Sequence, residues 1–272
     1  MEKSWQCCRL ASLLLTMLLA LLARPALFAH EAKEDPELAD VPSQDLQAGD
    51  DADKRYFLIG PRAKTAPPTV GYKLLVVLPG GSGDEQFLPF VRRICKNALP
   101  PEYLVAQPVA IQWTTDQQIV WPTSKLRVPE MKFTTEEFID AVIDDVAGRH
   151  KLDPKHCRTL SWSSSGPAAY VAALSSEKIT GSFVAMSVFN PNQLPELAAA
   201  KGRSFFLYHS PDDRVCPYRM AVQAKEVLSE NGAKVELKEY RGGHGWRGGL
   251  YDDIRAGIKW LEQNQPAESS TK

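Results

Sequence analysis

Apolar runs alternate with amphipathic segments between about residue 55 and residue 264 of the chain. The run "KLLVVL" (73–78) is apolar after its first position, which is typical of a strand buried on both faces. The segment "TTEEFIDAVIDDVAGRH" (134–150) has apolar residues at helical spacing, and Thr134 and Glu137 have capping-box spacing at its start. Strands alternating with helices predict an α/β fold, a mostly parallel central sheet with helices on both faces. We predict strands at 73–78, within 103–111, and at 158–162, 181–187, 204–210 and 233–240, and helices at 134–150, 217–232 and 250–264.

Polar motifs follow four of these predicted strands. In a parallel sheet the functional groups gather at the carboxyl ends of the strands, so these motifs are expected to meet at one edge. They are "PGGSGD" (79–84), "SSSGPAAY" (163–170), "PDDRVCPY" (211–218) and "RGGHGWRGG" (241–249).

The run of three serines fits a tight strand–turn–helix that presents a nucleophile. Such a nucleophile has a strained backbone, so the residues two before and two after it must be small. Ser164 would place Trp162 two residues before it, and Ser165 would place Pro167 two residues after it. Ser163 has a serine at both positions, where the usual motif has glycine, and Pro167 then falls in the first helical turn. Ser163 is the predicted nucleophile, and a flexible polar loop is the alternative interpretation of the motif alone.

A serine nucleophile needs a histidine base, and that base needs a carboxylate to orient it. In the strand–turn–helix hydrolases the chain order is serine, acid, histidine. Here Ser163 is followed by Asp212 and Asp213 and then by His244, each after a predicted strand. The aspartates alone could be turn residues, and His244 alone could be a surface histidine. Their joint order favours a catalytic triad.

Acyl transfer also needs two donors for the developing oxyanion. One is the backbone N–H of the residue after the nucleophile, here Ser164, and the other comes from the loop after an early strand. The glycine-rich "LPGGSG" (78–83) suits that loop because glycines allow close approach of the backbone to substrate. Gly81 is the first candidate and Ser82 the second. The stretch lacks the lysine of a phosphate-binding loop.

At this point the motifs resemble a known family. The segments "LPGG" (78–81), "SWSSSGPAA" (161–169), "HSPDDRVCP" (209–217) and "GGHGW" (242–246) resemble the phospholipase/carboxylesterase group of α/β-hydrolases, and they are similar to the related polyhydroxybutyrate-depolymerase-like and peptidase-like esterases. The resemblance implies the α/β-hydrolase fold, hydrolysis of esters or thioesters without a cofactor, and Asp213 as the catalytic acid. The sequence departs from the family pattern in its serines beside Ser163 and in Pro79, where many relatives have histidine.

The segment at 111–133 is irregular and carries large apolar residues. We predict that Trp113 and Trp121, with Met131 and Phe133 nearby, line an acyl pocket, and that Ser82 also contacts substrate. The alternative is a long connection that packs on its own domain.

The first 29 residues predict a secretory signal peptide, because Lys3 and Arg9 precede an uncharged run (10–23) that small residues follow. That run is shorter than the roughly 20 residues of a spanning helix, which favours cleavage over an N-terminal membrane anchor. We expect an exported protein with no integral membrane association after cleavage. Residues 30–54 are acidic and predict a disordered linker, residues 55–264 the catalytic domain, and residues 265–272 a disordered tail.

Charge and cysteine content indicate which kinds of partner and cofactor to expect. The net charge of −1 gives no electrostatic reason to expect nucleic acid, so the expected partner is a small-molecule ester. No cluster has zinc-ligand spacing, so we expect no metal and no cofactor. Cys95, Cys157 and Cys216 remain after signal cleavage, and at most one disulfide can form among them. The oligomeric state stays open.

Three functions are compatible with these features. The first is a serine hydrolase that cleaves carboxylic esters through an acyl-enzyme on Ser163. The second is a serine peptidase of the same fold, since fold alone does not separate the two activities. The third is a non-catalytic binding protein that retains the fold, which the complete set of triad residues disfavours.

Overall fold

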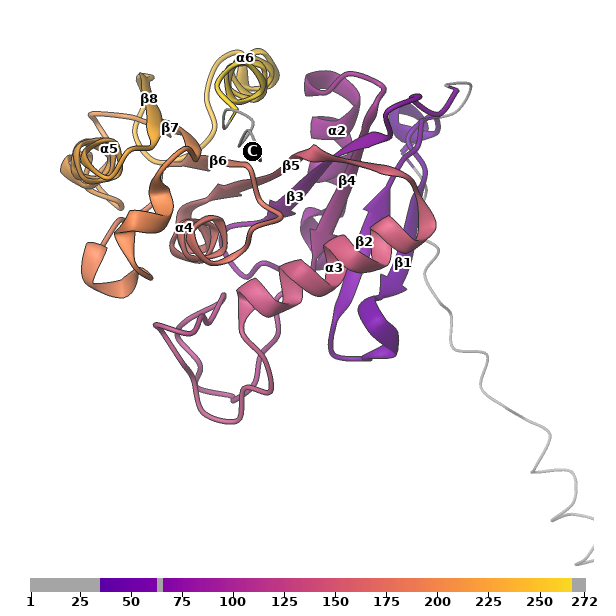
Figure 1. The fold of residues 1–272 in the computed structure, drawn as a ribbon, viewed down its shortest axis with the longest axis horizontal. Helices are drawn as coiled ribbons and strands as arrows, with labels where there is room; N and C mark the ends of the chain where they lie inside the picture. The colour runs from indigo at the N-terminus through magenta and orange to yellow at the C-terminus, as the bar shows by residue number, and fades with distance from the viewer. Residues whose placement is uncertain (1–34, 63–65, 266–272) are drawn as a thin grey trace, which may run out of the picture. The chain divides into compact units, whose positions relative to one another are not determined.

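The computed structural model describes residues 35–62 and 66–265, and every structural statement here concerns those residues. Their central element is an eight-stranded sheet with the order β1-β2-β4-β3-β5-β6-β7-β8 (Figure 1). Strands β3 to β8 are parallel to one another, whereas β2 pairs antiparallel with both β1 and β4. The strands are β1 (Ser43–Gln47), β2 (Arg55–Ile59), β3 (Tyr72–Leu78), β4 (Tyr103–Pro108), β5 (Leu152–Trp162), β6 (Gly181–Ala185), β7 (Ser204–His209) and β8 (Lys234–Glu239).

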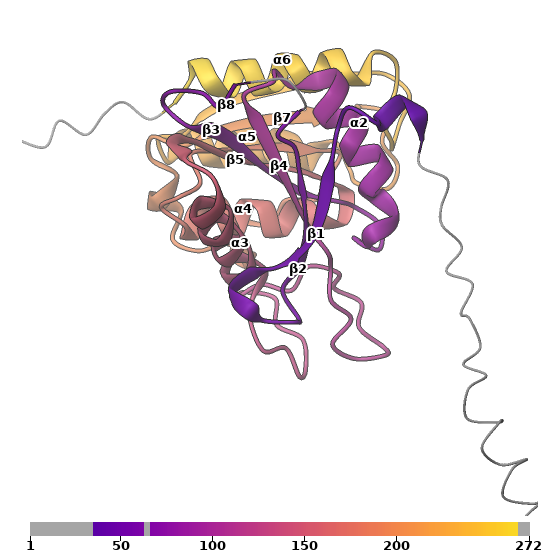
Figure 2. The same ribbon diagram turned by 90° about the vertical axis from the view of Figure 1, so that its right-hand side faces the viewer.

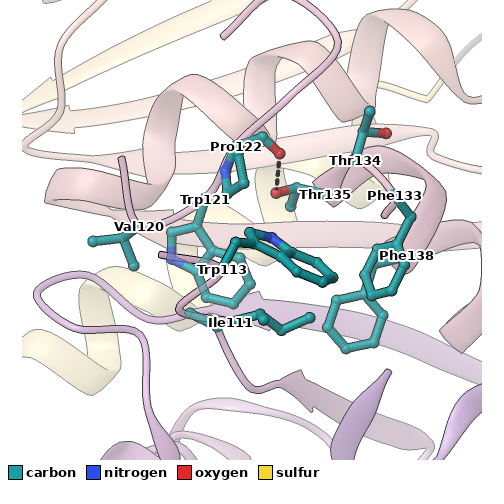
Figure 3. Close-up of a pocket in the computed structure, with 10 residues that line it drawn as sticks. Ile111, Trp113, Val120, Trp121, Pro122, Phe133, Thr134, Thr135 and Phe138 are labelled. Carbon is teal, nitrogen blue, oxygen red and sulfur yellow. Dashed lines mark hydrogen bonds between the residues drawn. The ribbon is translucent and has the colours of Figure 1, made fainter. Parts of the chain in front are cut away.

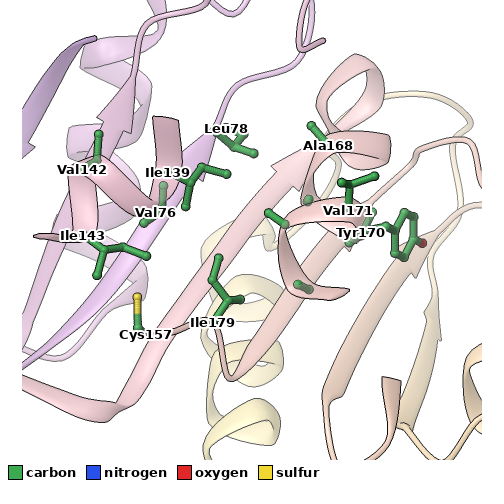
Figure 4. Close-up of a cluster of buried hydrophobic side chains, with 14 of the residues drawn as sticks. Val76, Leu78, Ile139, Val142, Ile143, Cys157, Ala168, Tyr170, Val171 and Ile179 are labelled. Carbon is green, nitrogen blue, oxygen red and sulfur yellow. The ribbon is translucent and has the colours of Figure 1, made fainter. Parts of the chain in front are cut away.

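Helices cover both faces of this sheet, as Figures 1 and 2 show. One buried cluster joins α3, α4 and α5 to one face, and Figure 4 draws part of it; a second cluster joins α2 and α6 to the other face. Strand β3 serves both clusters, with Val76 in the first and Val77 in the second. Its unbroken apolar sequence therefore reflects burial on both sides. The helices are α2 (Leu88–Ala98), α3 (Thr135–Arg149), α4 (Gly166–Ser175), α5 (Arg219–Glu230) and α6 (Leu250–Gln263).

The predicted fold class is confirmed. All six predicted strands and all three predicted helices are present; β5 begins at Leu152 rather than at residue 158, and the other ends differ by at most three residues. The capping box of α3 forms as its spacing indicated: the amide of Glu137 donates to Thr134 Oγ1 at 3.2 Å, and the amide of Thr134 donates to Glu137 Oε2 at 2.7 Å. These elements deliver the carboxyl ends of β3, β5, β7 and β8 to one edge of the sheet.

The prediction of a disordered linker over 30–54 is wrong for the part that the structure describes from Pro36 onward. That stretch contains two short 3-10 turns and β1, which pairs with β2 along its whole length. The few apolar residues of this stretch are enough to pack it against the domain, because Leu38, Val41 and Ala48 are buried. The guanidinium of Arg92 also donates to the carbonyls of Leu38 and Val41 at 2.7 and 2.9 Å. An edge strand needs little apolar surface of its own because the neighbouring strand supplies its hydrogen bonds.

The predicted signal peptide (1–29) and nearly all of the predicted tail (265–272) lie outside the described residues. Across residues 35–62 and 66–265, no helix has the length and apolar character needed to cross a membrane.

Candidate active site

The three serines sit on a sharp turn between β5 and α4. Ser163 follows the last residue of β5 and has a φ of 58°, a backbone conformation that residues other than glycine seldom adopt. Its carbonyl accepts a hydrogen bond of 2.6 Å from the hydroxyl of Ser187, which follows β6. Gly166 must be glycine because a Cβ there would lie 2.0 Å from that same hydroxyl oxygen. The turn thus has the strain and the tight packing expected where a nucleophile leaves a strand.

The structure brings Ser163, His244 and Asp213 into one hydrogen-bonded chain. Ser163 Oγ lies 3.0 Å from His244 Nε2, and His244 Nδ1 lies 2.8 Å from Asp213 Oδ2. An ionised carboxylate only accepts hydrogen bonds, so the Nδ1 atom carries the proton and Nε2 is left to accept the proton of the serine hydroxyl. Asp212, by contrast, is exposed and pairs with Arg241 at 3.4 Å. The geometry therefore selects Asp213 from the adjacent pair.

The carboxylate of Asp213 is buried and well supported. Its Oδ1 atom accepts hydrogen bonds from the amides of Val215 and Cys216 at 2.8 and 2.9 Å. Burial alone would raise its pKa, but the hydrogen bonds from His244 and from the two amides outweigh that effect, and the pKa lies below its usual value. The acid therefore stays ionised at neutral pH and can stabilise a protonated His244.

A second histidine contacts the same carboxylate. His209, buried at the end of β7, places its Nε2 atom 2.8 Å from the carbonyl oxygen of Cys216 and 3.3 Å from Asp213 Oδ2. Burial is the main cause that lowers the pKa of His209, so the ring is neutral and its Nε2–H donates to these acceptors. Sequence analysis missed this residue, although it stands four positions before Asp213 in the "HSPDD" segment.

The loop that carries His244 is fixed by aromatic packing. Trp246 lies with its ring centroid 5.8 Å from that of Trp162, the residue before the serine turn, and 5.9 Å from that of Tyr208 in β7. The hydroxyl of Tyr240 donates to the carbonyl of Gly243 at 2.9 Å. These contacts anchor both sides of His244, so the glycine-rich sequence around it does not leave it free.

The two predicted oxyanion donors lie in loops that touch each other. Gly80 packs against the serine turn so closely that a Cβ would lie 2.5 Å from the carbonyl oxygen of Trp162. Gly81 follows with a φ of 61°. Among the residues that the structure describes, no group accepts a hydrogen bond from the amide of Gly81 or from that of Ser164. The role of these two N–H groups as oxyanion donors stays a prediction.

The hydroxyl of Ser165 forms structural hydrogen bonds at a position where the usual motif has glycine. It donates to the carbonyl of Leu78 at 2.6 Å and accepts from the amide of Trp162 at 3.1 Å. It therefore ties the end of β5 to the end of β3, where the glycine-rich loop begins. This explains how the turn accommodates a serine at this position.

Within the described residues, the residues predicted to bind substrate make no hydrogen bond with Ser163, His244 or Asp213. Ser82 donates to Asp84 Oδ2 at 2.6 Å within its own loop. Trp121 is buried, and its Nε1–H donates to the carbonyl of Pro79 at 2.9 Å, so this side chain helps to hold the start of the glycine-rich loop in place. Trp113 packs edge-on against Phe133 with ring centroids 5.1 Å apart.

Trp113, Trp121 and Phe133 do share a pocket (Figure 3), but no triad residue lines it. Its cavity of about 10 Å³ has room for roughly one water molecule, so no acyl chain fits in this conformation. Met131 is buried outside the pocket lining. The predicted role of these side chains in binding an acyl chain stays a prediction.

Within residues 35–62 and 66–265, no group of three or more His, Cys, Asp or Glu side chains is arranged to hold a metal ion. Cys95, Cys157 and Cys216 are buried free thiols. Burial raises the pKa of Cys216 to about 11, which keeps this thiol beside the acid loop protonated.

Comparison with solved structures places this arrangement in a known fold. A carboxylesterase from Mesorhizobium loti has a TM-score of 0.58 at 17% identity, over 82% of this chain and 99% of that one. A truncated carbohydrate esterase from gut microbiota has a TM-score of 0.60 at 12% identity, over 82% and 96%. Esterase 2 of Thermogutta terrifontis, phosphorylated by paraoxon, has a TM-score of 0.57 at 12% identity, over 84% and 94%. The chain therefore has the α/β-hydrolase fold. No protein-family model matches the sequence, and a comparison with curated proteins finds no match either.

Proposed function

We propose that this protein is a serine hydrolase that cleaves carboxylic esters through an acyl-enzyme on Ser163. The observation that carries the proposal is the hydrogen-bonded chain from Ser163 through His244 to Asp213, with the serine on a strained turn. The fold supports it, because solved structures with the same fold include carboxylesterases.

The chemistry follows from the positions of these atoms. His244 Nε2 takes the proton from Ser163 Oγ as that oxygen attacks the ester carbonyl carbon. The oxyanion that forms accepts hydrogen bonds from the amides of Gly81 and Ser164, an interaction for which one donor is typically worth about 10²–10³ in rate. His244 then donates its proton to the leaving alkoxide, and the alcohol departs. His244 Nε2 then takes a proton from water as the water attacks the acyl-enzyme, and it returns this proton to Ser163 Oγ as the acid leaves.

The proposed substrates are aryl or alkyl esters with short to medium acyl chains, with thioesters as an extension of the same chemistry. The residues that hold the transition state need no metal or cofactor for acyl transfer. No contact in the described residues favours a peptide substrate over an ester, so peptidase activity is an outcome for the experiment to detect.

A fluorophosphonate probe and a series of p-nitrophenyl esters test the proposal together. This choice of probe has a precedent in the esterase phosphorylated by paraoxon, which shares the fold. Wild type should be labelled and should hydrolyse the esters with and without EDTA. Ser163→Ala should lose labelling and lower the rate by several orders of magnitude, whereas Ser229→Ala, on the exposed side of α5, should match wild type.

Three outcomes would count against the proposal. Equal labelling of wild type and Ser163→Ala would remove the nucleophile assignment. Loss of ester hydrolysis in EDTA would remove the metal-free mechanism. Turnover of peptide anilides without turnover of esters would assign the site to a peptidase.

We further propose that the protein is exported by residues 1–29, on the basis of their basic start and short apolar run. Mass spectrometry of the protein recovered from its native host should find an N-terminus near residue 30. Recovery of the intact N-terminus in the membrane fraction would favour the anchor instead.

A further inference from the structure

The three consecutive serine hydroxyls point to three different partners. Ser163 Oγ faces His244 and Ser165 Oγ faces the end of β3. Ser164 Oγ, which the proposed mechanism does not use, donates to the carbonyl of Gly81 at 3.0 Å. This bond joins the nucleophile turn to the glycine-rich loop, 83 residues earlier in the chain.

The other carbonyls around Gly81 are held without Ser164. Trp121 Nε1 donates to the Pro79 carbonyl at 2.9 Å, and the Gly83 amide donates to the Gly80 carbonyl at 3.1 Å. The Gly83 carbonyl accepts from the amide of Ala110 at 3.0 Å. Within the described residues, Ser164 is the only partner of the Gly81 carbonyl. The orientation of the Gly81–Ser82 peptide therefore depends on this hydroxyl.

That orientation decides which amide faces the reacting carbonyl. In a trans peptide the C=O and the following N–H point in opposite directions, so a Gly81 carbonyl directed at Ser164 turns the Ser82 N–H away from it. The Gly81 N–H, which belongs to the preceding peptide, is then left as the candidate donor beside the Ser164 N–H. Rotation of this peptide changes ψ of Gly81 and φ of Ser82, so without the Ser164 hydrogen bond the Gly81 carbonyl oxygen could turn toward the oxyanion.

We propose that the Ser164 hydroxyl is a positioning group that holds the Gly81–Ser82 peptide in the orientation in which the oxyanion hole is formed. The proposal rests on the ester hydrolysis proposed above. In this proposal Ser164 has two roles: its N–H donates a hydrogen bond to the oxyanion, and its Oγ–H donates a hydrogen bond to the Gly81 carbonyl.

The test compares Ser164→Ala, which removes the hydroxyl, with Ser164→Thr, which keeps it. A neutral hydrogen bond of this kind corresponds to a rate effect of up to about tenfold. Ser164→Ala should lower kcat for p-nitrophenyl esters by about that factor with little change in KM, because the oxyanion exists only in the transition state. Ser164→Thr should stay within about twofold of wild type, as should the control Ser229→Ala.

Two further readouts separate positioning from a general loss of structure. A boronic acid that forms a tetrahedral adduct should bind Ser164→Ala more weakly by the same factor as kcat falls. The pH profile of kcat/KM and the thermal unfolding midpoint should not move.

The outcomes distinguish a failure of this inference from a failure of the proposed ester hydrolysis. If wild type is not labelled by the fluorophosphonate, the proposed function fails. If wild type is labelled and Ser164→Ala has unchanged kcat and unchanged boronic acid affinity, the hydroxyl has no positioning role. A loss in Ser164→Thr as large as that in Ser164→Ala would also overturn it.

Discussion

Neighbouring residues of the same type have separate roles in this site. Asp212 and Asp213 are chemically identical in the sequence, and only the family resemblance distinguished them there. In the structure, Asp213 alone turns inward to the imidazole and to two backbone amides. The residue types and chain order of the proposed triad could be predicted from the sequence. The contacts of His209 and Ser187 could not, because their partners include backbone carbonyls distant in sequence or across a turn.

The first residue-scale prediction compares the two aspartates. Asp213→Asn should lower kcat/KM for esters by about 10⁴, because an amide can stabilise the wrong tautomer of His244 and cannot stabilise its charged form. Asp212→Asn should have a small effect, since its carboxylate only pairs with the exposed Arg241. Steady-state kinetics under one set of conditions decides the matter. A larger loss for Asp212→Asn would reverse the assignment.

The second residue-scale prediction concerns how the stability of the fold depends on pH. Burial lowers the pKa of His209 and of His156 in the folded state, whereas both are near 6.5 in the unfolded chain. The unfolded state therefore binds more protons below about pH 6.5, so this contribution to stability is complete above that pH and is lost as the pH falls below it. The unfolding midpoint should drop between pH 7 and pH 5, with a shallower drop in His209→Gln and in His156→Gln. An unchanged slope in His209→Gln would show that folding does not lower the pKa of His209.

At the scale of elements, the site depends on turns that are short and tightly packed. Local signals in the sequence predicted the cap of α3 and the helix after Ser163, because the interacting residues are close in the chain. Helix α2 was missed although Val91, Ile94, Cys95 and Ala98 stand at helical spacing on its buried side. The packing of the His244 loop was also missed, since it depends on aromatic rings from β5, β7 and α2 that only the fold brings together.

The loop prediction concerns Trp246, two residues after His244. Its indole N–H is buried without a partner in the described residues, so the ring acts through packing and Trp246→Phe sacrifices no hydrogen bond. Trp246→Phe should keep stability within about 1.5 kcal/mol and retain most of the activity. Trp246→Ala should cost about 3 kcal/mol and should also lower kcat by displacing His244. Chemical denaturation and ester kinetics measure the two effects. Equal losses in both variants would assign the role to the indole N–H.

At the scale of the whole molecule, the alternation of strands and helices was enough to predict the fold class but not the order of the strands. That order depends on pairings between distant segments, and the antiparallel β1 and β2 complete the sheet from a stretch with little apolar periodicity. The acidic composition of residues 30–54 concealed the few side chains that enter the core. Composition averages over a segment, whereas a single buried leucine can fix a short segment in place.

The last prediction tests whether this N-terminal stretch belongs to the folded unit. Leu38 is 1% exposed, and its carbonyl accepts a hydrogen bond from Arg92 of α2. Leu38→Ala in the full chain should lower the free energy of unfolding by about 3 kcal/mol, as for other leucines cut back to alanine in a packed core. The matched control Gln44→Ala, at an exposed position of β1, should change it by less than about 0.5 kcal/mol. Urea denaturation of both variants provides the comparison. If Leu38→Ala is as stable as Gln44→Ala, the stretch is the unstructured linker that its composition indicated; a large difference means that the sheet is stabilised by its first strand and by the turn that precedes it.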